Sequence, residues 1–229
     1  MEQTLIGISS KATGPLLAEL ARTYETAHGR AVKMESVGGV DAARRVAEGE
    51  AFDVVVLEGA QIAKQVAAGR VVAGSERAMV HSRAMVAVRA GAARPPVGTL
   101  KEFQDALLAA RAVGYSTGPS GVILLKMIED WGLKDKLGAR MVQAPPGKPV
   151  GALLAEGAVD VGIQQYSELM NLPGVDILGP LPPGAEINSV FTASVCAASK
   201  QPEEARRLVE YLASPAIAET KRRQGFEPA

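Results

Sequence analysis

Strand-like and helix-like segments alternate along the first 70 residues, and this order constrains the fold more than any other feature. Three short apolar runs, at residues 4–8, 31–36 and 52–58, are typical of buried strands. An amphipathic segment with helical spacing follows each of them. Strands joined in this way by helices run parallel, with helices packed on both faces of the sheet. The alternation therefore predicts an α/β fold with mostly parallel sheets.

The same alternation resumes after a longer extended segment at residues 78–89 and ends before another at residues 187–199. Two long strands that flank a second α/β unit indicate a chain that leaves one lobe and later returns to it. We therefore expect a lobe formed by residues 1–83 and 185–229 and a second lobe formed by residues 84–184. A cleft between two such lobes is a common place for a small ligand.

Composition excludes several classes of function. The 229 residues include 25 basic and 25 acidic side chains, so a net charge of zero gives no general attraction to nucleic acid or to an anionic membrane. The single cysteine, Cys196, rules out an internal disulfide and lies in an apolar run typical of a buried strand, which favours a structural thiol. His28 and His81 lie far apart on different predicted elements, which argues against a metal site. No apolar run reaches the roughly 20 residues of a membrane-spanning helix.

The first ten residues do not resemble a secretory signal, because they lack a basic start and an apolar middle. Two interpretations stay open from the sequence. The protein is cytoplasmic, or it is the mature form of an exported protein whose signal has been replaced by Met1.

Polar turns follow the predicted parallel strands, and the carboxyl ends of parallel strands share one edge of a sheet. Several of these turns precede helices, whose free N–H groups and positive dipole end attract anions. Serine or threonine before a helix is also a common N-cap, worth about 1 kcal/mol, so the prediction depends on several turns meeting at one edge. The residues expected to contact an anionic ligand are Ser9, Ser10, Lys11, Gly38, Gly39, Val40, Arg83, Ser116, Thr117, Gly118, Ser120, Gly121, Gln164, Gln165 and Tyr166.

Four side chains in these turns could transfer a proton, and the sequence does not rank them: Lys11, Glu58, Tyr166 and Glu168. A carboxylate at the start of a helix can also act simply as a favourable charge for the helix dipole. Arg44 and Arg45, in the helix after the glycine pair, are expected on a solvated helix face.

The string "GYSTG" at residues 114–118 matches the G-x-S-x-G motif of α/β-hydrolases. In those enzymes the catalytic histidine follows the serine along the chain, whereas His28 and His81 both precede Ser116. A hydrolase site is therefore not expected. The sequence also contains no Walker loop and no G-x-G-x-x-G motif.

The order of motifs resembles the molybdate-binding proteins of ABC transporters, which are two-lobed type II periplasmic binding proteins. The similarity covers essentially the whole chain through "GISS", "AARRVAEGEAFDVVVLEG", "RAMVAVRAGA", "GPSG" and "AVDVGIQQYSEL". The ligand positions depart from that family. Gly38 and Gly39 replace a serine, Leu57 to Gly59 replace a serine-alanine-aspartate sequence, and Gln165 replaces a tyrosine. The lost hydroxyl groups argue against tetrahedral molybdate.

The pattern "GISS…ESVGGVDAARRV…GIQQYSEL" is more similar to the aconitate isomerases, which are enzymes built on the same fold. That resemblance implies a tricarboxylate ligand, an allylic proton shift, no cofactor and a periplasmic location, although a cytoplasmic one stays open. The alternative is a substrate-binding protein that carries an oxyanion or organic acid to a membrane permease. A third interpretation, the effector-binding part of a regulator, is disfavoured because the sequence contains no helix-turn-helix motif.

Overall fold

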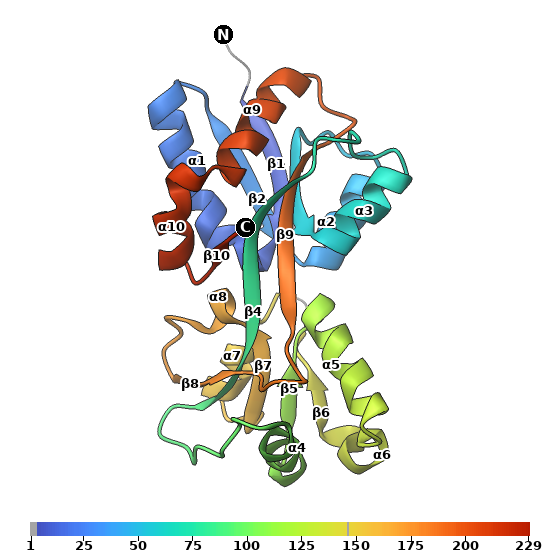
Figure 1. The fold of residues 1–229 in the computed structure, drawn as a ribbon, viewed down its shortest axis with the longest axis vertical. Coiled ribbons are helices and arrows are strands. Elements are labelled where there is room, and N and C mark those ends of the chain that lie inside the picture. The colour runs from blue at the N-terminus through green and yellow to red at the C-terminus, as the bar shows by residue number, and fades with distance from the viewer. Residues whose placement is uncertain (1–3, 146) are drawn as a thin grey trace. The chain divides into compact units, whose positions relative to one another are not determined.

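The computed structural model describes residues 4–145 and 147–229 (Figure 1). The chain forms two compact units, one made of Met1–Ser82 with Ser189–Ala229 and the other of Arg83–Asn188. The second unit extends four residues beyond the predicted boundary at 184, because Ala185 and Ile187 are buried in its core. It also begins one residue before the predicted start at 84.

The elements of the two units are as follows. The first unit contains β1 (Leu5–Ser10), a 3-10 helix (Lys11–Thr13), α1 (Gly14–His28), β2 (Val32–Val37), α2 (Gly39–Ala47), β3 (Val54–Glu58), α3 (Gly59–Ala67), α9 (Pro202–Ala213), a 3-10 helix (Pro215–Ile217), α10 (Ala218–Arg223) and β10 (Glu227–Pro228). The second contains α4 (Leu100–Ala109), β5 (Val113–Tyr115), α5 (Pro119–Asp130), α6 (Lys134–Leu137), a 3-10 helix (Gly138–Arg140), β6 (Met141–Gln143), α7 (Val150–Ala155), β7 (Val161–Gln165), α8 (Tyr166–Leu169) and β8 (Val175–Pro180). The chain passes between the units within β4 (Arg77–Arg89) and at the start of β9 (Asn188–Val195).

The sheet of the first unit has parallel strands at its centre. Strand β1 lies between β2 and β3 and runs parallel to both, with Ser9 in register with Ser36 and with Val56. Strand β9 then pairs with β3 in the antiparallel direction. Helices α1 and α9 pack on one face of this sheet, and α2 and α3 pack on the other (Figure 1).

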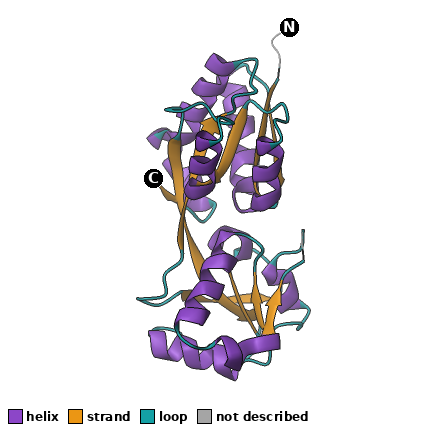
Figure 2. Ribbon diagram, turned by 90° about the vertical axis from the view of Figure 1, so that its right-hand side faces the viewer, coloured by secondary structure: helices purple, strands orange, loops and turns teal. Residues whose placement is uncertain are grey.

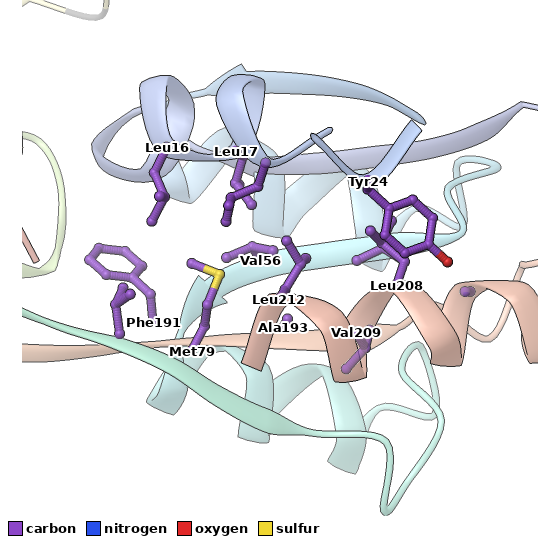
Figure 3. Packing of buried hydrophobic residues seen from close by; sticks show 14 of the residues in the cluster. Leu16, Leu17, Tyr24, Val56, Met79, Phe191, Ala193, Leu208, Val209 and Leu212 are labelled. Carbon is purple, nitrogen blue, oxygen red and sulfur yellow. The ribbon is translucent and has the colours of Figure 1, made fainter. Parts of the chain in front are cut away.

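The main core of the first unit lies between the sheet and helices α1 and α9. Leu16 and Leu17 from α1 and Leu208 and Leu212 from α9 belong to one cluster with the sheet residue Val56 (Figure 3). All five side chains are almost completely buried. Each such burial contributes about 1.5–3 kcal/mol, which explains why α1 and α9 are held on this sheet although they are distant in sequence.

The second unit repeats the pattern with different partners. Strand β5 runs parallel to β6 and β7, and β4 pairs with β7 and β8 in the antiparallel direction. Phe103 of α4 and Leu124 of α5 are buried in the core on one face of the sheet, and Leu154 of α7 is buried on the other. Helices cover the strands in each unit (Figure 2).

The predicted α/β, two-lobed class is confirmed, and each sheet combines parallel strands with antiparallel strands. Helix α1 ends at His28, and its C-cap Gly29 adopts the left-handed conformation with a φ of 68°. Strand β8 was not predicted, because residues 178–186 are rich in glycine and proline. It forms through pairing with β4, which includes a register shift between Val86 and Ala87. None of the described helices is both long and apolar enough to cross a lipid bilayer.

A buried lysine on α10 makes the stability depend on pH. The side chain of Lys221 is 0% exposed, and its Nζ donates a hydrogen bond to the Ser214 carbonyl at 3.4 Å. Burial lowers the pKa of Lys221 to about 8. An unfolded lysine keeps its proton up to about pH 10, so between these two values the unfolded chain binds more protons than the folded chain.

We therefore expect the free energy of unfolding to rise with pH between about 8 and about 10. Lys221→Met should remove this rise and stabilise the protein at pH 7 by on the order of 2–3 kcal/mol. Urea unfolding at a series of pH values measures both effects. Lys64→Met, at an exposed position on α3, is the control. A slope that Lys221→Met leaves unchanged would contradict the assignment.

Candidate functional site

In the first unit, the carboxyl ends of β1, β2 and β3 lie at one edge of the sheet. Ser9 and Ser36 are neighbours in register, and their Oγ atoms lie 2.8 Å apart. Ser9 also donates a hydrogen bond to the Ser10 carbonyl at 3.2 Å. The Ser9 hydroxyl therefore joins the ends of β1 and β2 and does not cap a helix.

Ser10 has a different environment from Ser9. Its side chain is only 7% exposed, and among the described residues its Oγ has no hydrogen-bond partner. It does not cap the 3-10 helix that follows. A buried hydroxyl without a partner costs about 1–3 kcal/mol, so Ser10 carries a cost that a ligand or a water molecule would offset.

Gln61 lies beside Ser10 and was not predicted from the sequence. Its Nε2 donates to the Gly39 carbonyl at 3.4 Å, while its buried Oε1 has no partner among the described residues. A Cβ atom on Gly39 would lie 3.5 Å from Ser10 Cβ and 3.6 Å from Gln61 Oε1. Gly39 therefore lies between two polar side chains with unused hydrogen-bonding capacity. The sequence did contain a signal for Gln61: it lies in the first turn of the helix that follows β3, next to the edge where the other candidate residues were expected.

The amino end of α2 completes this group. Gly38 is its N-cap and provides no side-chain cap, and the first intrahelical bond runs from the Ala42 N–H to the Gly38 carbonyl at 2.8 Å. The N–H groups of Gly39, Val40 and Asp41 therefore have no partner within the helix. Free N–H groups at a helix start, next to the Ser10 hydroxyl, form an arrangement that accepts an oxyanion.

The charged candidates of this unit lie at the same edge. Lys11 follows Ser10 directly and is exposed. Glu58 is the N-cap of α3, and its Oε2 accepts the Ala60 N–H at 3.0 Å. This hydrogen bond agrees with the alternative role considered for Glu58, that of a helix N-terminal charge.

In the second unit, the turn between β5 and α5 brings together Ser116, Ser120 and Gly121. Ser116 Oγ lies 3.1 Å from Ser120 Oγ, and Ser120 is buried. A Cβ atom on Gly121 would lie 1.9 Å from the Ser116 carbonyl oxygen, so only glycine fits there. Gly118 is the N-cap of α5 and provides no side-chain cap, which leaves the first N–H groups of this helix without one. Thr117 in this turn is exposed.

The end of β7 lies at the same edge of the second sheet, because β7 runs parallel to β5. Gln164 is buried and structural: its Oε1 accepts the Val150 N–H at 2.8 Å, and its Nε2 donates to Glu168 Oε1 at 2.9 Å. Gln165 is buried, and Tyr166 and Glu168 are half-buried at the start of α8.

The remaining predicted residues lie on exposed surfaces or in the core. Arg83 is exposed on β4. Arg44 is exposed, as expected, with ion pairs to residues of its own helix and C-cap. Arg45 is more buried than expected: it pairs with Glu50 and Glu35, which raise its pKa.

Burial, together with Asp53, raises the pKa of the Cys196 thiol to about 12, in agreement with a structural role. In the part of the chain that the structure describes, no three His, Cys, Asp or Glu side chains are placed to hold a metal ion.

Comparison with known protein families assigns the chain to one family. The family model described as bacterial extracellular solute-binding protein matches residues 6–227. The chain belongs to this family. The chain is also similar to an aconitate isomerase from a Pseudomonas species, with 34% identity over 232 residues that cover 98% of this chain and 88% of the relative.

Solved structures agree with the fold of a solute-binding protein. The periplasmic molybdate-binding protein of Azotobacter vinelandii superimposes with a TM-score of 0.79 at 19% identity, covering 97% of this chain and 98% of that one. The sulfate-binding protein SubI of Mycobacterium tuberculosis superimposes with a TM-score of 0.81 at 18% identity, covering 100% and 88% of the two chains. The resemblance to molybdate-binding proteins predicted from the sequence is thereby confirmed at the level of the fold.

Proposed function

We propose that this solute-binding protein is an isomerase that interconverts cis- and trans-aconitate. The similarity to the Pseudomonas aconitate isomerase over nearly the whole chain carries the proposal. The edge of the first sheet supports it, because several neutral hydrogen-bond donors meet there beside one lysine. Such groups suit a ligand with several carboxylates. We further propose that the protein acts in the periplasm.

The reaction is a proton shift along a three-carbon unit. A base takes a proton from the methylene carbon beside a carboxylate, and the electron pair of the broken C–H bond forms a double bond to the central carbon. The former double bond becomes a single bond, and its outer carbon receives a proton. The conformation about the bond from the methylene carbon to the central carbon, when the proton is removed, decides whether the new double bond is cis or trans. Atoms and charge balance without an oxidant or a reductant, so the reaction needs only acid–base groups and stabilisation of the charge on the carboxylates.

Within this proposal each group at the edge of the first sheet has a role. The Ser10 hydroxyl and the N–H groups at the start of α2 bind one carboxylate, and Lys11 provides positive charge. Glu58 is the proposed base, because it is the carboxylate at the carboxyl end of β3. Gln61 positions the start of α2 for the ligand, because its Nε2 donates to the Gly39 carbonyl. The other proposed ligand residues keep their predicted roles: Gly38, Gly39, Val40, Arg83, Ser116, Thr117, Gly118, Ser120, Gly121, Gln165 and Tyr166. Ser9 and Gln164 are not proposed as ligand residues, because their polar atoms already bond within the protein. Tyr166 and Glu168 are the remaining candidates for proton transfer.

The two serines of β1 provide a prediction that separates binding from structure. Ser10→Ala should weaken aconitate binding by roughly tenfold and leave stability unchanged or slightly higher, because the lost hydroxyl has no hydrogen-bond partner among the residues that the structure describes. Ser9→Ala should lower stability by about 1 kcal/mol, because it removes the hydrogen bond to Ser36. Calorimetric titration and urea unfolding measure the two effects. Equal affinity in the wild type and Ser10→Ala would exclude Ser10 from the site.

An NMR time course tests the proposed activity. The protein is incubated in deuterated water with cis-aconitate and, separately, with trans-aconitate. We expect each isomer to appear from the other, with deuterium bound to carbon in the product. A protein that binds aconitate without converting it would refute the isomerase proposal.

The second candidate function is that of a carrier for an ABC transporter, which the family match and the fold of the molybdate- and sulfate-binding proteins favour. In that case the ligand is a small anion, and a membrane permease is the partner. A thermal-shift series with molybdate, sulfate, citrate and aconitate distinguishes the two functions. A large shift with one inorganic oxyanion, together with no turnover of aconitate, would support the carrier.

A further inference from the structure

The second unit contains a hollow of about 720 Å³ at the edge of its sheet opposite the turn that contains Ser116. Its lining includes Arg111 and Asp160, which precede β5 and β7, whereas Ser116 and Tyr166 follow the same strands. Because β5 and β7 run parallel, the hollow lies at their amino ends. It is therefore separate from the candidate ligand residues of this unit.

Small side chains create the space inside this hollow. Ala92, Ala106, Ala109 and Gly157 contribute little volume to its wall. The buried strand residue Val88 adds an apolar surface, as do other valines of the neighbouring strands. An apolar floor of this kind favours a ligand with a hydrocarbon body, and the volume is within the range of small-molecule sites.

Three arginines line the same hollow: Arg89, Arg94 and Arg111. Arg111 is held by Asp160, with its Nη2 2.9 Å from Oδ1 and its backbone N–H donating to Oδ2 at 2.7 Å. Arg94 has two long contacts of 3.4 Å, one with the Asp176 carboxylate and one with the Ile177 carbonyl oxygen. Glu156, the other acid of the lining, pairs with Lys148 at 2.6 Å, so one arginine has no carboxylate partner among the described residues.

Arg89 is that uncompensated arginine. Its guanidinium forms no hydrogen bond or ion pair with any residue that the structure describes. A Cβ atom on Gly157 would lie 3.6 Å from Arg89 Nη1, and the Gly157 carbonyl accepts a hydrogen bond from Arg111 Nη2 at 3.2 Å. Two guanidinium groups thus approach the same glycine, although only Arg111 has a carboxylate partner.

We propose that this hollow is a second binding site, for a small organic carboxylate with an apolar body. The carboxylate pairs with the Arg89 guanidinium, whose fork of donors matches two carboxylate oxygens. The apolar body lies against the alanines and the valine floor. The proposal is independent of the isomerase function, because it uses none of the residues assigned to the reaction.

An NMR titration of the ¹⁵N-labelled full chain with benzoate tests the proposal. We expect saturable shifts of the backbone amides of Ala109 and Gly157. Arg89→Gln should weaken benzoate binding by about tenfold, because it removes the charged partner. Ala109→Leu, at an exposed helix position, should weaken it by filling the hollow without disturbing the core. Lys101→Gln, on the same helix outside the lining, is the matched control and should leave binding unchanged.

Three results would overturn the proposal. The first is the absence of saturable shifts at these amides. The second is benzoate binding that neither Arg89→Gln nor Ala109→Leu weakens. The third is equal affinity for the neutral analogue benzamide, which would show that the guanidinium contributes nothing. Thermal unfolding of each variant confirms that weakened binding does not come from a damaged fold.

Discussion

Replacing Glu58 by glutamine should lower the turnover of aconitate by about a hundredfold to ten-thousandfold while the protein stays folded. The carboxylate at this position is the proposed base, and an amide cannot accept the proton. The glutamine side chain still has an oxygen to accept the Ala60 N–H, which Glu58 binds at 3.0 Å. The cap of α3 is therefore kept while the basic group is lost.

Initial rates with saturating trans-aconitate, together with urea unfolding of the same samples, measure both properties. Glu58→Ala removes the cap as well as the carboxylate and should also lower stability, by about 1 kcal/mol. Glu25→Gln, at an exposed position on α1, is the control for loss of a carboxylate elsewhere. Full turnover by Glu58→Gln would leave Glu58 only as a helix cap and transfer the role of base to Lys11, Tyr166 or Glu168.

Replacing Gly121 by alanine should cause the largest loss of stability of any single methyl addition in the turns that we propose bind ligand. The new Cβ would lie 1.9 Å from the Ser116 carbonyl oxygen and 3.0 Å from its carbon, which are backbone atoms. Alanine is favoured over glycine in a helix by about 1 kcal/mol. The overlap with backbone exceeds this gain, because forced overpacking costs about 1–3 kcal/mol and the turn has no flexible side chain that could move instead.

The matched control is Gly118→Ala in the same turn. Gly118 has a φ of −81°, which alanine adopts readily, and the nearest atom to its new Cβ is Ser116 Oγ at 3.7 Å. We expect a small change for Gly118→Ala and a loss of about 2 kcal/mol or more for Gly121→Ala in urea unfolding. Similar stabilities for the two variants would show that the turn relaxes at little cost.

The sequence alone determined the fold class and the position of most elements. Short apolar runs and amphipathic segments with helical spacing are local properties, so the residues themselves indicate where the elements β1 to α3 lie. The sequence also predicted which turns share an edge, because parallel strands place their following turns together. Ser9, Ser10 and Gly39 were identified in this way. The resemblance to molybdate-binding proteins followed from the same motifs.

Only the tertiary structure decided what these residues do there. Strand register and helix packing decide the pairing of Ser9 with Ser36 and the placement of Gln61 beside Gly39. They also decide that the Ser10 hydroxyl has no partner within residues 4–145 and 147–229. The same is true of β8, which forms through pairing with a strand distant in sequence. Local periodicity contains no information on such contacts, because their free energy comes from groups that become neighbours only when the chain folds.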